Sequence, residues 1–570
     1  MAAAIEADAL SLEEFVRLPT TVTFDAMITK HLQEFVKKNP YIKLGTHLGT
    51  GYVPVHVDIA HIPTLTRELG KHYLLNPAIL SPLGTFAHDQ AGITSILQHP
   101  HLKLTGKGVI IGFVDTGIDY TKDVFRHEDG SSKIISIWDQ TIEGPRPPEL
   151  YFGAEYTGEQ INQALQSDRP LDIVPSTDTD GHGTFLASLA AGRNTGDYSG
   201  AAPDARLVVV KLKRAHQYFI NDFLLPPDNP NYYQNSDMML GMEYIVNVAN
   251  RLDAPMVICL GMGSNDTGHD GYTMFEEYIS HLSQRPGFAV VNGAGNESNA
   301  RHHTQGQLLR TGSTSTIGIR VGDRQTSFRV NIFGSSYDKI SVGIVSPSGE
   351  VISRVPFNLD ADTTEDFTFD RTTVTIRYYR AINMVITVGF QNAKEGLWEV
   401  ILYGDAILGG EYHAWLPITG QVSPNVYFMK AVPDVTIVYP ATALKTMACG
   451  AYDAQSGSLY VSSSWGPTRL PRLAPDFVAP GVDVQGMLPT GLGTMTGTST
   501  AAAITTGAVA LMLQWGIIQG YYPSMDGDVA RVLLISGCRR EEGQHYPNNK
   551  WGYGRLDLYQ TFSALRESML

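Results

Sequence analysis

The sequence has little cysteine, no excess of positive charge and few charged residues. Its 570 residues include only three cysteines, Cys259, Cys449 and Cys538, which lie in apolar or mixed surroundings without metal-ligand spacing. Unpaired thiols of this kind are typical of a reducing compartment and argue against a disulfide-stapled secreted scaffold. The formal net charge of −15 argues against a nucleic-acid partner and against an anionic membrane surface.

Long apolar runs and an export signal are also lacking. No uninterrupted apolar run reaches the ~18 residues of a membrane span, so we expect no membrane-spanning segment. The N-terminal stretch MAAAIEADALSLEEF is acidic and does not have the basic and apolar regions of a secretory signal. We therefore expect a soluble protein made without a standard export signal. With 43% hydrophobic residues, it can bury a large core, and its length suggests several domains.

A serine stands at the start of an apolar segment near the C-terminus. The stretch MTGTSTAAA, residues 495–503, runs into ITTGAVALMLQWG, which predicts a buried helix from residue 504 to 516. Ser499 could cap this helix by accepting a hydrogen bond from a first-turn N–H. It could also be a nucleophile, because the same N–H groups and the helix dipole favour negative charge there. The stretch alone favours the cap.

Three other polar residues lie at predicted strand ends or helix starts. Asp115 follows the apolar run 109–114, which is typical of a parallel strand buried on both faces. His182 lies between two glycines at the start of a predicted helix, and Asn296 ends the strand-like run FAVVNGAGNES. Taken singly, each has an ordinary structural interpretation as a turn or capping residue. Taken together, a carboxylate, an imidazole, a hydroxyl and an amide are the parts of a nucleophilic acyl-transfer site.

The motifs DTGID, GHGT, AGN and GTSxAA, in this chain order, resemble the signatures of the subtilisin-like serine proteases. The resemblance implies that Asp115 orients the imidazole, His182 is the general base and Ser499 is the nucleophile. It also implies that the Asn296 side chain and the Ser499 N–H form the oxyanion hole.

The same resemblance implies two walls of a substrate pocket. These walls contain only small or uncharged residues, which favours a medium-sized uncharged substrate side chain; they are Gly261, Met262 and Gly263 on one side, and Gly293, Ala294 and Gly295 on the other. The implied chemistry requires no cofactor. Structural calcium is an open question, because the acidic run at residues 178–181 is an equally good turn former, and we assign no metal.

Three further strings are most similar to the clostridial Csp-type subtilases, which are linked to spore germination. They are the triple alanine 501–503, the LMLQWGI after it and the terminal WGYGRLDL. Most of the wider family has proline where Ala503 stands, and Phe185 is also unusual. Neither position supplies a catalytic group, so these departures concern only the branch of the family.

The resemblance and the local patterns divide the chain into three parts. We expect an N-terminal α+β propeptide over residues 1–84, in which residues 22–39 have a helical period. The catalytic domain, an α/β fold with a parallel sheet and helices on both faces, would comprise residues 85–304 and 441–570. Residues 305–440 contain short β-rich runs between turn residues and are expected to form an inserted jelly-roll β-sandwich. Residues 139–176 are expected to be loop.

The sequence therefore predicts a serine endopeptidase that acts on a protein or peptide. By resemblance it would mature by self-cleavage near residues 83–87, keep its own propeptide in the cleft and activate a protein zymogen of the spore cortex-lytic type. It would then be cytoplasmic or spore-associated. The alternatives are a catalytically silent relative that signals in germination and a general protease with no role in spores.

Overall fold

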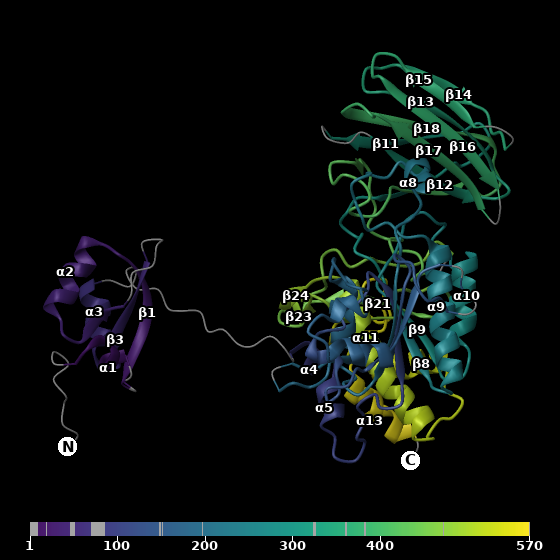
Figure 1. Ribbon diagram of the computed structural model, residues 1–570. Coiled ribbons are helices and arrows are strands. Elements are labelled where there is room, and N and C mark those ends of the chain that lie inside the picture. The colour runs from purple at the N-terminus through teal and green to yellow at the C-terminus, as the bar shows by residue number, and fades with distance from the viewer. Residues whose placement is uncertain are drawn as a thin grey trace. The chain divides into compact units, whose positions relative to one another are not determined.

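The computed structural model describes residues 10–16, 18, 20–45, 52–69, 86–147, 150, 152–196, 198–322, 327–359, 362–380, 383–470 and 472–568 (Figure 1). The chain divides into two compact units, residues 1–82 and residues 83–570. Each unit is described by itself.

The N-terminal unit is a small α+β fold around a three-stranded antiparallel sheet of order β1-β3-β2. Its elements are α1 (Leu12–Val16), β1 (Thr21–Met27), α2 (Lys30–Lys38), β2 (Ile42–Leu44), β3 (Tyr52–Asp58), the 3-10 turn η2 (Ile59–His61) and α3 (Ile62–Leu69). The prediction of a helix over residues 22–39 is wrong in its first half, which is strand β1. The helix starts only after Thr29, whose side chain accepts a hydrogen bond from the Leu32 N–H and caps α2.

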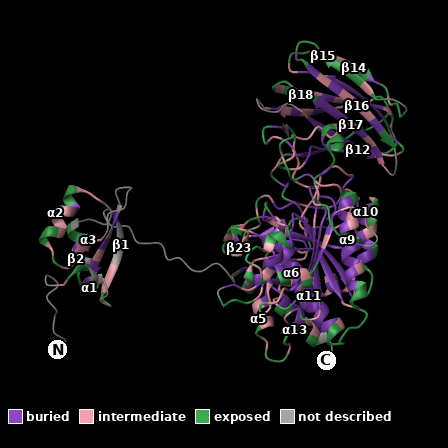
Figure 2. Ribbon diagram, viewed as in Figure 1, coloured by how far each residue is buried: buried purple, intermediate pink, exposed green. Residues whose placement is uncertain are grey.

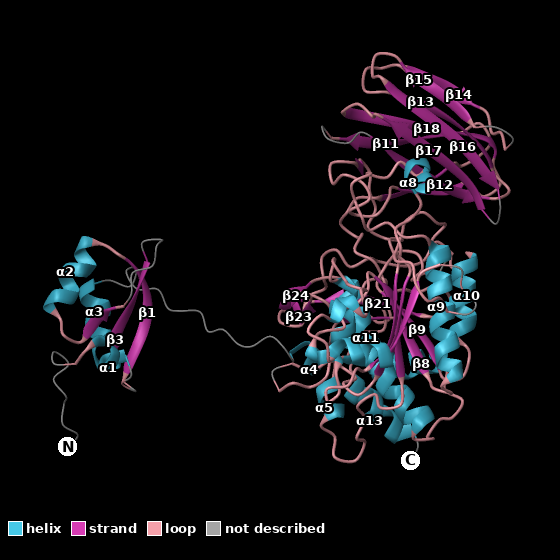
Figure 3. Cartoon of the chain, viewed as in Figure 1, coloured by secondary structure: helices cyan, strands magenta, loops and turns pink. Residues whose placement is uncertain are grey.

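The second unit is built on an eight-stranded sheet of order β22-β21-β9-β8-β4-β7-β5-β6 (Figure 3). Every pairing in it is parallel except that of β5 with β6 at one edge. The strands are β4 (Ile110–Asp115), β5 (Ile134–Asp139), β6 (Ala154–Thr157), β7 (Arg206–Lys211), β8 (Met256–Leu260), β9 (Phe288–Gly293), β21 (Met447–Tyr452) and β22 (Phe477–Pro480). The predicted subtilisin-like α/β core is therefore present.

Alternate side chains of each central strand enter two different apolar cores. In β4, Ile111 and Phe113 belong to one core, whereas Ile110 and Val114 belong to the other, and all four are fully buried. Figure 2 shows the central strands of this unit in the colour of buried residues. The first core is covered by α7 (His182–Ala191), α11 (Thr498–Leu513), α12 (Gly527–Gly537) and α13 (Leu558–Ser568), and the second by α9 (Asn235–Arg251) and α10 (Met274–Ser283). Burial on both faces explains why the strands have continuous apolar runs.

Helix α11 continues into a π-helical turn at Gln514–Ile518, and Thr498–Ile518 is long and apolar enough to cross a membrane. No uninterrupted apolar run in the sequence reveals this length, because Thr505 and Thr506 interrupt the run without interrupting the helix; the expectation of no membrane-spanning segment stays a prediction. Their hydroxyls donate to the carbonyls of residues 501 and 502, which satisfies them inside the core. In its most apolar window, 89% of the residues are buried within the protein.

Short elements connect these layers. They are α4 (Phe86–Gln90), α5 (Ile93–Leu97), η3 (Asp123–Phe125), α6 (Gly158–Leu165), η4 (Pro170–Asp172), α8 (Gln217–Asp222) and the hairpin of β23 (Val484–Leu488) and β24 (Gly491–Met495). The prediction of loop over residues 139–176 missed β6 and α6. Helix α6 begins at a capping box in which Thr157 and Gln160 satisfy each other's backbone N–H groups.

Between β9 and β21 the chain forms two antiparallel sheets that share one apolar core. The six-stranded sheet has the order β10-β19-β12-β17-β16-β15, and the five-stranded sheet has the order β14-β13-β18-β11-β20. The strands are β10 (His303–Gln307), β11 (Thr314–Val321), β12 (Ser327–Ser335), β13 (Lys339–Val345), β14 (Val351–Val355), β15 (Thr363–Phe367), β16 (Thr372–Arg380), β17 (Asn383–Gln391), β18 (Gly396–Ala406), β19 (Glu411–Trp415) and β20 (Tyr427–Phe428). We call this segment, residues 303–428, the inserted β-domain.

Histidines and Trp415 pack at the junction between the inserted β-domain and the catalytic part. The rings of His269 and His303 stack on Trp415 with centroid distances of 4.2 and 4.8 Å. His303 and His413 are also stacked and share a 3.0 Å hydrogen bond. Nearby, Asp270 accepts hydrogen bonds from Arg469 and from Asn383 of β17. The junction is thus a buried polar cluster rather than a flexible link.

We predict that acid destabilises this junction. Burial lowers the pKa of His269 to about 4 and holds the pKa values of His303 and His413 below the usual value. In the unfolded chain these histidines bind protons near pH 6.5, whereas in the folded protein they stay neutral to a lower pH. The free energy of unfolding is therefore highest above pH 6.5 and decreases as the pH falls towards 4. Each histidine can contribute a slope of up to about 1.4 kcal/mol per pH unit.

Calorimetry between pH 7 and pH 5 measures this slope. His269→Phe keeps a ring against Trp415 but cannot bind a proton, so its melting temperature should fall less steeply with acid than that of the wild type. Equal slopes for the two proteins would contradict the prediction.

Candidate active site

Asp115 is the last residue of the central strand β4, at the carboxyl edge of the sheet. Its side chain is 1% exposed, and the Thr116 N–H donates to its Oδ1 at 2.8 Å. The same oxygen lies 2.8 Å from Nδ1 of His182. Strand β4 therefore places the buried Asp115 carboxylate against the His182 imidazole, and this contact fixes the orientation of the imidazole ring.

His182 is the first residue of α7, and glycines allow it to come this close. A Cβ on Gly183 would lie 2.2 Å from the Gly117 carbonyl oxygen, so only glycine fits behind the imidazole. Burial disfavours the imidazolium, but the charge and hydrogen bond of Asp115, with help from Asp180 and Asp178, outweigh it and raise the pKa of His182. The hydrogen bond to Asp115 occupies Nδ1 of the ring and leaves the other ring nitrogen as the base. The His182 side chain is 21% exposed.

Ser499 is the second residue of α11, within the first turn of the core helix. Its N–H is one of the first four of the helix, which have no intrahelical acceptor. The side chain is partly exposed, whereas its neighbours Thr498 and Thr500 are buried. The position suits a hydroxyl that must react and a backbone N–H that must hold negative charge.

Gly261 lies between His182 and Ser499. A Cβ on this glycine would come 3.0 Å from His182 Cε1 and 3.2 Å from Ser499 Cβ, so the two side chains flank the same small residue. The structure thus brings together Asp115, His182 and Ser499, although they are far apart in the sequence. Their order along the site is carboxylate, imidazole and hydroxyl, which is the arrangement that general-base activation of a serine needs.

Asn296 follows β9 and lies beside the start of α11. The Thr498 N–H donates to Asn296 Oδ1 at 3.0 Å, which leaves the amide NH₂ as a donor towards the cleft. In return, the Gly295 N–H donates to the Thr498 hydroxyl at 3.0 Å. Sequence reasoning gave Thr498 no role, although its place beside the serine was a signal for one. Through these two hydrogen bonds, Thr498 holds the Asn296 loop next to Ser499.

We expect Asn296→Ala to lower kcat by about 10²–10³ with little change in KM. The amide would contact the substrate oxygen most strongly after that oxygen becomes an oxyanion, so its loss affects the transition state more than substrate binding. Steady-state hydrolysis of a chromogenic peptide measures the effect. Asn250→Ala, in the last turn of α9, is a control for the loss of an amide, and an equal decrease in both variants would contradict the assignment.

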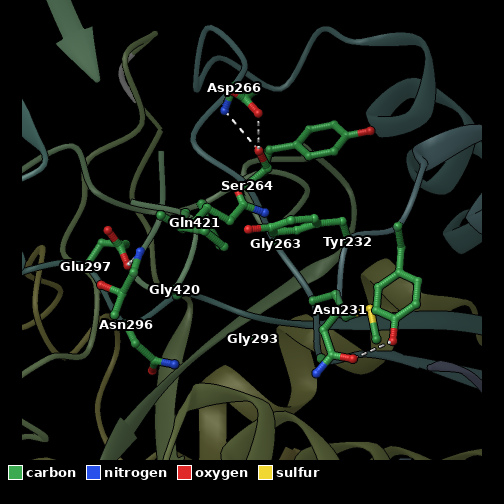
Figure 4. A pocket seen from close by; sticks show the side chains of 18 of the residues that line it. Asn231, Tyr232, Gly263, Ser264, Asp266, Gly293, Asn296, Glu297, Gly420 and Gln421 are labelled. Carbon is green, nitrogen blue, oxygen red and sulfur yellow. Dashed lines mark hydrogen bonds between the residues drawn. The ribbon is translucent and has the colours of Figure 1, made fainter. Parts of the chain in front are cut away.

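The site opens into a cleft of about 1250 Å³. Among the predicted pocket residues, five line it: Gly261, Met262, Gly263, Gly293 and Gly295. Gly263 and Gly293 are labelled in Figure 4. Ala294 does not line the cleft, because its side chain is fully buried in a small cluster with Ile437, Ala441, Ala448 and Ala474. Residues of a strand end alternate in direction, so the middle residue of this wall faces away from the cleft.

Two segments that the sequence did not mark also line the cleft. One lies between β7 and α9 and includes Asn231 and Tyr233; the other is the loop between β19 and β20, which includes Gly420 and Gln421. Neither carries a motif, because their position depends on the packing of the inserted β-domain. Short-range sequence patterns contain no signal for such a contact.

The acidic run before α7 and the three cysteines each have defined surroundings in the structure. Within the described ranges, no group of three or more His, Cys, Asp or Glu side chains is placed to hold a metal ion. Asp178, in the run considered for calcium, accepts hydrogen bonds from Gly181 and Thr184 and so supports the turn before α7. The three cysteines are buried, and burial raises the pKa values of Cys259 and Cys449 to about 12.

Comparisons with known proteins show the family to which the chain belongs. Residues 106–374 and 422–554 match the Subtilase family. The chain is 23% identical to the minor extracellular protease Vpr of Bacillus subtilis over 489 residues, which is 81% of this chain and 52% of that protein. It is 30% identical to the subtilisin-like protease SBT2.2 of Arabidopsis thaliana over 204 residues, 32% of this chain and 24% of that protein.

A solved structure is also similar. The structure of the Clostridium perfringens CspB protease has a TM-score of 0.75 and 27% identity, covering 85% of this chain and 98% of that one. The chain spans about half or less of the two curated relatives named above. The resemblance drawn from the motifs is confirmed: the chain belongs to the subtilase family of serine peptidases.

Proposed function

We propose that the protein is a serine endopeptidase with the triad Asp115, His182 and Ser499. The observation that carries the proposal is the 2.8 Å contact between the buried Asp115 carboxylate and His182, beside a serine at a helix N-terminus in one cleft. A purely structural capping serine would need neither the imidazole nor the carboxylate.

The proposed reaction follows from these positions. His182 takes the Ser499 hydroxyl proton as Oγ attacks the substrate carbonyl, and the Asn296 amide and Ser499 N–H hold the resulting oxyanion. His182 then gives the proton to the departing amine, which leaves an ester on Ser499. Water, activated by the same imidazole, hydrolyses that ester and restores the hydroxyl.

We further propose maturation by self-cleavage near residues 83–87, with residues 1–84 acting as a propeptide that stays in the cleft. Residues 83–85 lie outside the described residues. As the physiological activity we propose limited proteolysis of a protein zymogen of the spore cortex-lytic type, which rests on the resemblance of the sequence motifs to the Csp-type subtilases. The similarity to the structure of the Clostridium perfringens CspB protease supports the protease part of this proposal. The protein would then act in the cytoplasm or in the spore, and the reaction itself needs no cofactor.

Intact-mass analysis of the purified chain tests the core of this proposal. Wild type and Ser499→Ala are each measured with and without a phosphonate serine-hydrolase probe. We expect the wild type to appear as two fragments divided near residues 83–87, with one probe on the larger fragment once the propeptide has been displaced from the cleft. Ser499→Ala should remain whole and unlabelled.

The alternatives predict different results. A catalytically silent signalling relative would stay whole and unlabelled even after the N-terminal unit is removed by a second protease at an engineered site. A general protease would label but would degrade many unfolded proteins at similar rates, whereas a zymogen-activating enzyme would cut few sites.

A further inference from the structure

One wall of the candidate cleft belongs to the inserted β-domain. The loop between β19 and β20 places Ile418, Gly420 and Gln421 in the same cleft as His182 and Ser499. Figure 4 shows Gly420 and Gln421 near Glu297 and Asn296, with Asn231 and Tyr232 on the opposite side. A bound substrate would therefore meet the inserted β-domain at the active site itself.

Glu297 holds this loop in place. Its side chain is 4% exposed, and the Thr419 N–H donates to its Oε1 at 2.9 Å. Its other oxygen lies 2.8 Å from His302 Nδ1 and accepts a longer hydrogen bond from Asn265. A buried carboxylate needs such partners, and here they come from three segments of the chain. Because Glu297 follows Asn296 directly, it ties the loop to the proposed oxyanion residue.

Two hydrogen bonds hold the opposite wall of the cleft, which contains Asn229 and Asn231, in place. Asn231 Nδ2 donates to Asp180 Oδ2 at 2.6 Å, two residues before His182. Asn229 Nδ2 donates to the Gly420 carbonyl at 3.3 Å, which joins this wall to the loop of the inserted β-domain. The segment 229–231 thus runs from the imidazole side of the cleft to the opposite wall and meets it.

From this contact we infer that loop 418–422 and segment 229–231 form a roof over the Ser499 cleft, which limits substrates to flexible polypeptide segments. Glu297 is the positioning residue of the roof. The inference rests on the proposed peptidase function and names its substrate class. A compact folded loop cannot pass under two joined walls, whereas a free chain end can thread beneath them. An internal segment enters only when the Asn229–Gly420 hydrogen bond opens.

A reversible crosslink tests the roof directly. The three native cysteines are buried, so new surface cysteines can be modified selectively. We place them at Asn229 and Thr419, since Gly420 has a φ of +90° that would strain a cysteine. A cleavable bis-maleimide joins them, and the substrates are a linear peptide and its head-to-tail cyclic form, which cannot thread.

We expect the crosslink to raise the ratio of linear to cyclic cleavage by about tenfold or more, and linker cleavage to reverse the change. An unchanged ratio, whatever the absolute rates, would overturn the roof. Each single-cysteine variant treated with the same reagent is the control. Phosphonate labelling of Ser499 reports on the proposed function separately, because failure before crosslinking would refute the peptidase and not the roof.

Substitution of Glu297 gives a second test that needs no crosslink. Glu297→Ala frees the Thr419 N–H and should let the roof open, so cyclic cleavage should rise relative to linear cleavage. Glu297→Gln keeps an oxygen for Thr419 and should restore most of the wild-type ratio. Asp338→Ala is the matched control, because this buried carboxylate also accepts backbone N–H groups, but at residues 408–410 outside the cleft lining. Equal ratios in Glu297→Ala and Asp338→Ala would overturn the role of Glu297.

Discussion

His182→Ala is expected to lower kcat by about 10⁶, with KM close to that of the wild type. The neutral Ser499 hydroxyl is a weak nucleophile, and the proposed site offers one base within reach of it, the imidazole held by Asp115. Without that base the proton has no acceptor as the Oγ–C bond forms. The walls that bind the peptide stay in place, so substrate binding should change little.

The decrease in kcat caused by His182→Ala should not add to the decrease caused by Ser499→Ala. Because both residues serve one proton transfer, the double variant His182→Ala/Ser499→Ala should be about as inactive as either single variant. Single-turnover hydrolysis of a chromogenic peptide, normalised to protein that is folded by circular dichroism, measures all three. His281→Ala, on the exposed side of α10, controls for the loss of a histidine.

Two outcomes would contradict the assignment. A decrease in kcat of less than about 10²-fold for His182→Ala would mean that another group takes the proton. Losses that multiply in the double variant would mean that the two side chains act in separate steps. Either result would leave the family membership intact while removing His182 from the proposed mechanism.

The proposed site residues were predictable because each one is marked by local physical requirements. Asp115 ends a strand that is buried on both faces, and such a strand is visible as a continuous apolar run. His182 needs Gly183 behind it, since a Cβ there would meet the Gly117 carbonyl. Ser499 needs the start of the buried helix. These demands fall within a few neighbouring residues, so short motifs record them.

The errors came from features that depend on distant contacts. Residues 22–27 belong to the stretch 22–39, whose helical period suggests a helix, but pairing with β3 makes them part of a strand. The walls that Asn231 and Gly420 form in the cleft depend on how the inserted β-domain packs. The burial of Glu297 also depends on His302 and Thr419. No window of the sequence contains these partners together, which is why the sequence could predict the proposed triad but not these additional walls of the cleft.

Asp115→Asn is expected to lower kcat by about 10⁴ and to move the acid limb of the pH–rate profile to lower pH. An asparagine can present its NH₂ to the imidazole, which favours the wrong tautomer and takes away the acceptor for the Nδ1 proton. The rate falls because Nε2 then carries the proton and cannot accept the one from Ser499. Some activity should remain from the oxyanion donors alone.

The pH effect has a definite sign. Burial lowers the pKa of His182, and the negative charge of Asp115 is the main reason that the net shift is nevertheless upward. In the wild type the base is therefore protonated until the pH passes above the usual histidine range near 6.5, and activity rises through that raised pKa. Removing the charge lets burial dominate, so the variant should lose activity only at a lower pH.

Asp180→Asn separates charge from orientation. Asp180 also raises the pKa of His182, but its carboxylate contacts the His182 backbone N–H and not the ring. Its replacement should shift the acid limb slightly downward while keeping most of the plateau rate, because the Asp115–Nδ1 hydrogen bond still selects the tautomer. If Asp115→Asn and Asp180→Asn lowered the plateau equally, the catalytic effect of Asp115 would be electrostatic alone. A large loss confined to Asp115→Asn would instead establish that the carboxylate acts mainly by holding the imidazole in position.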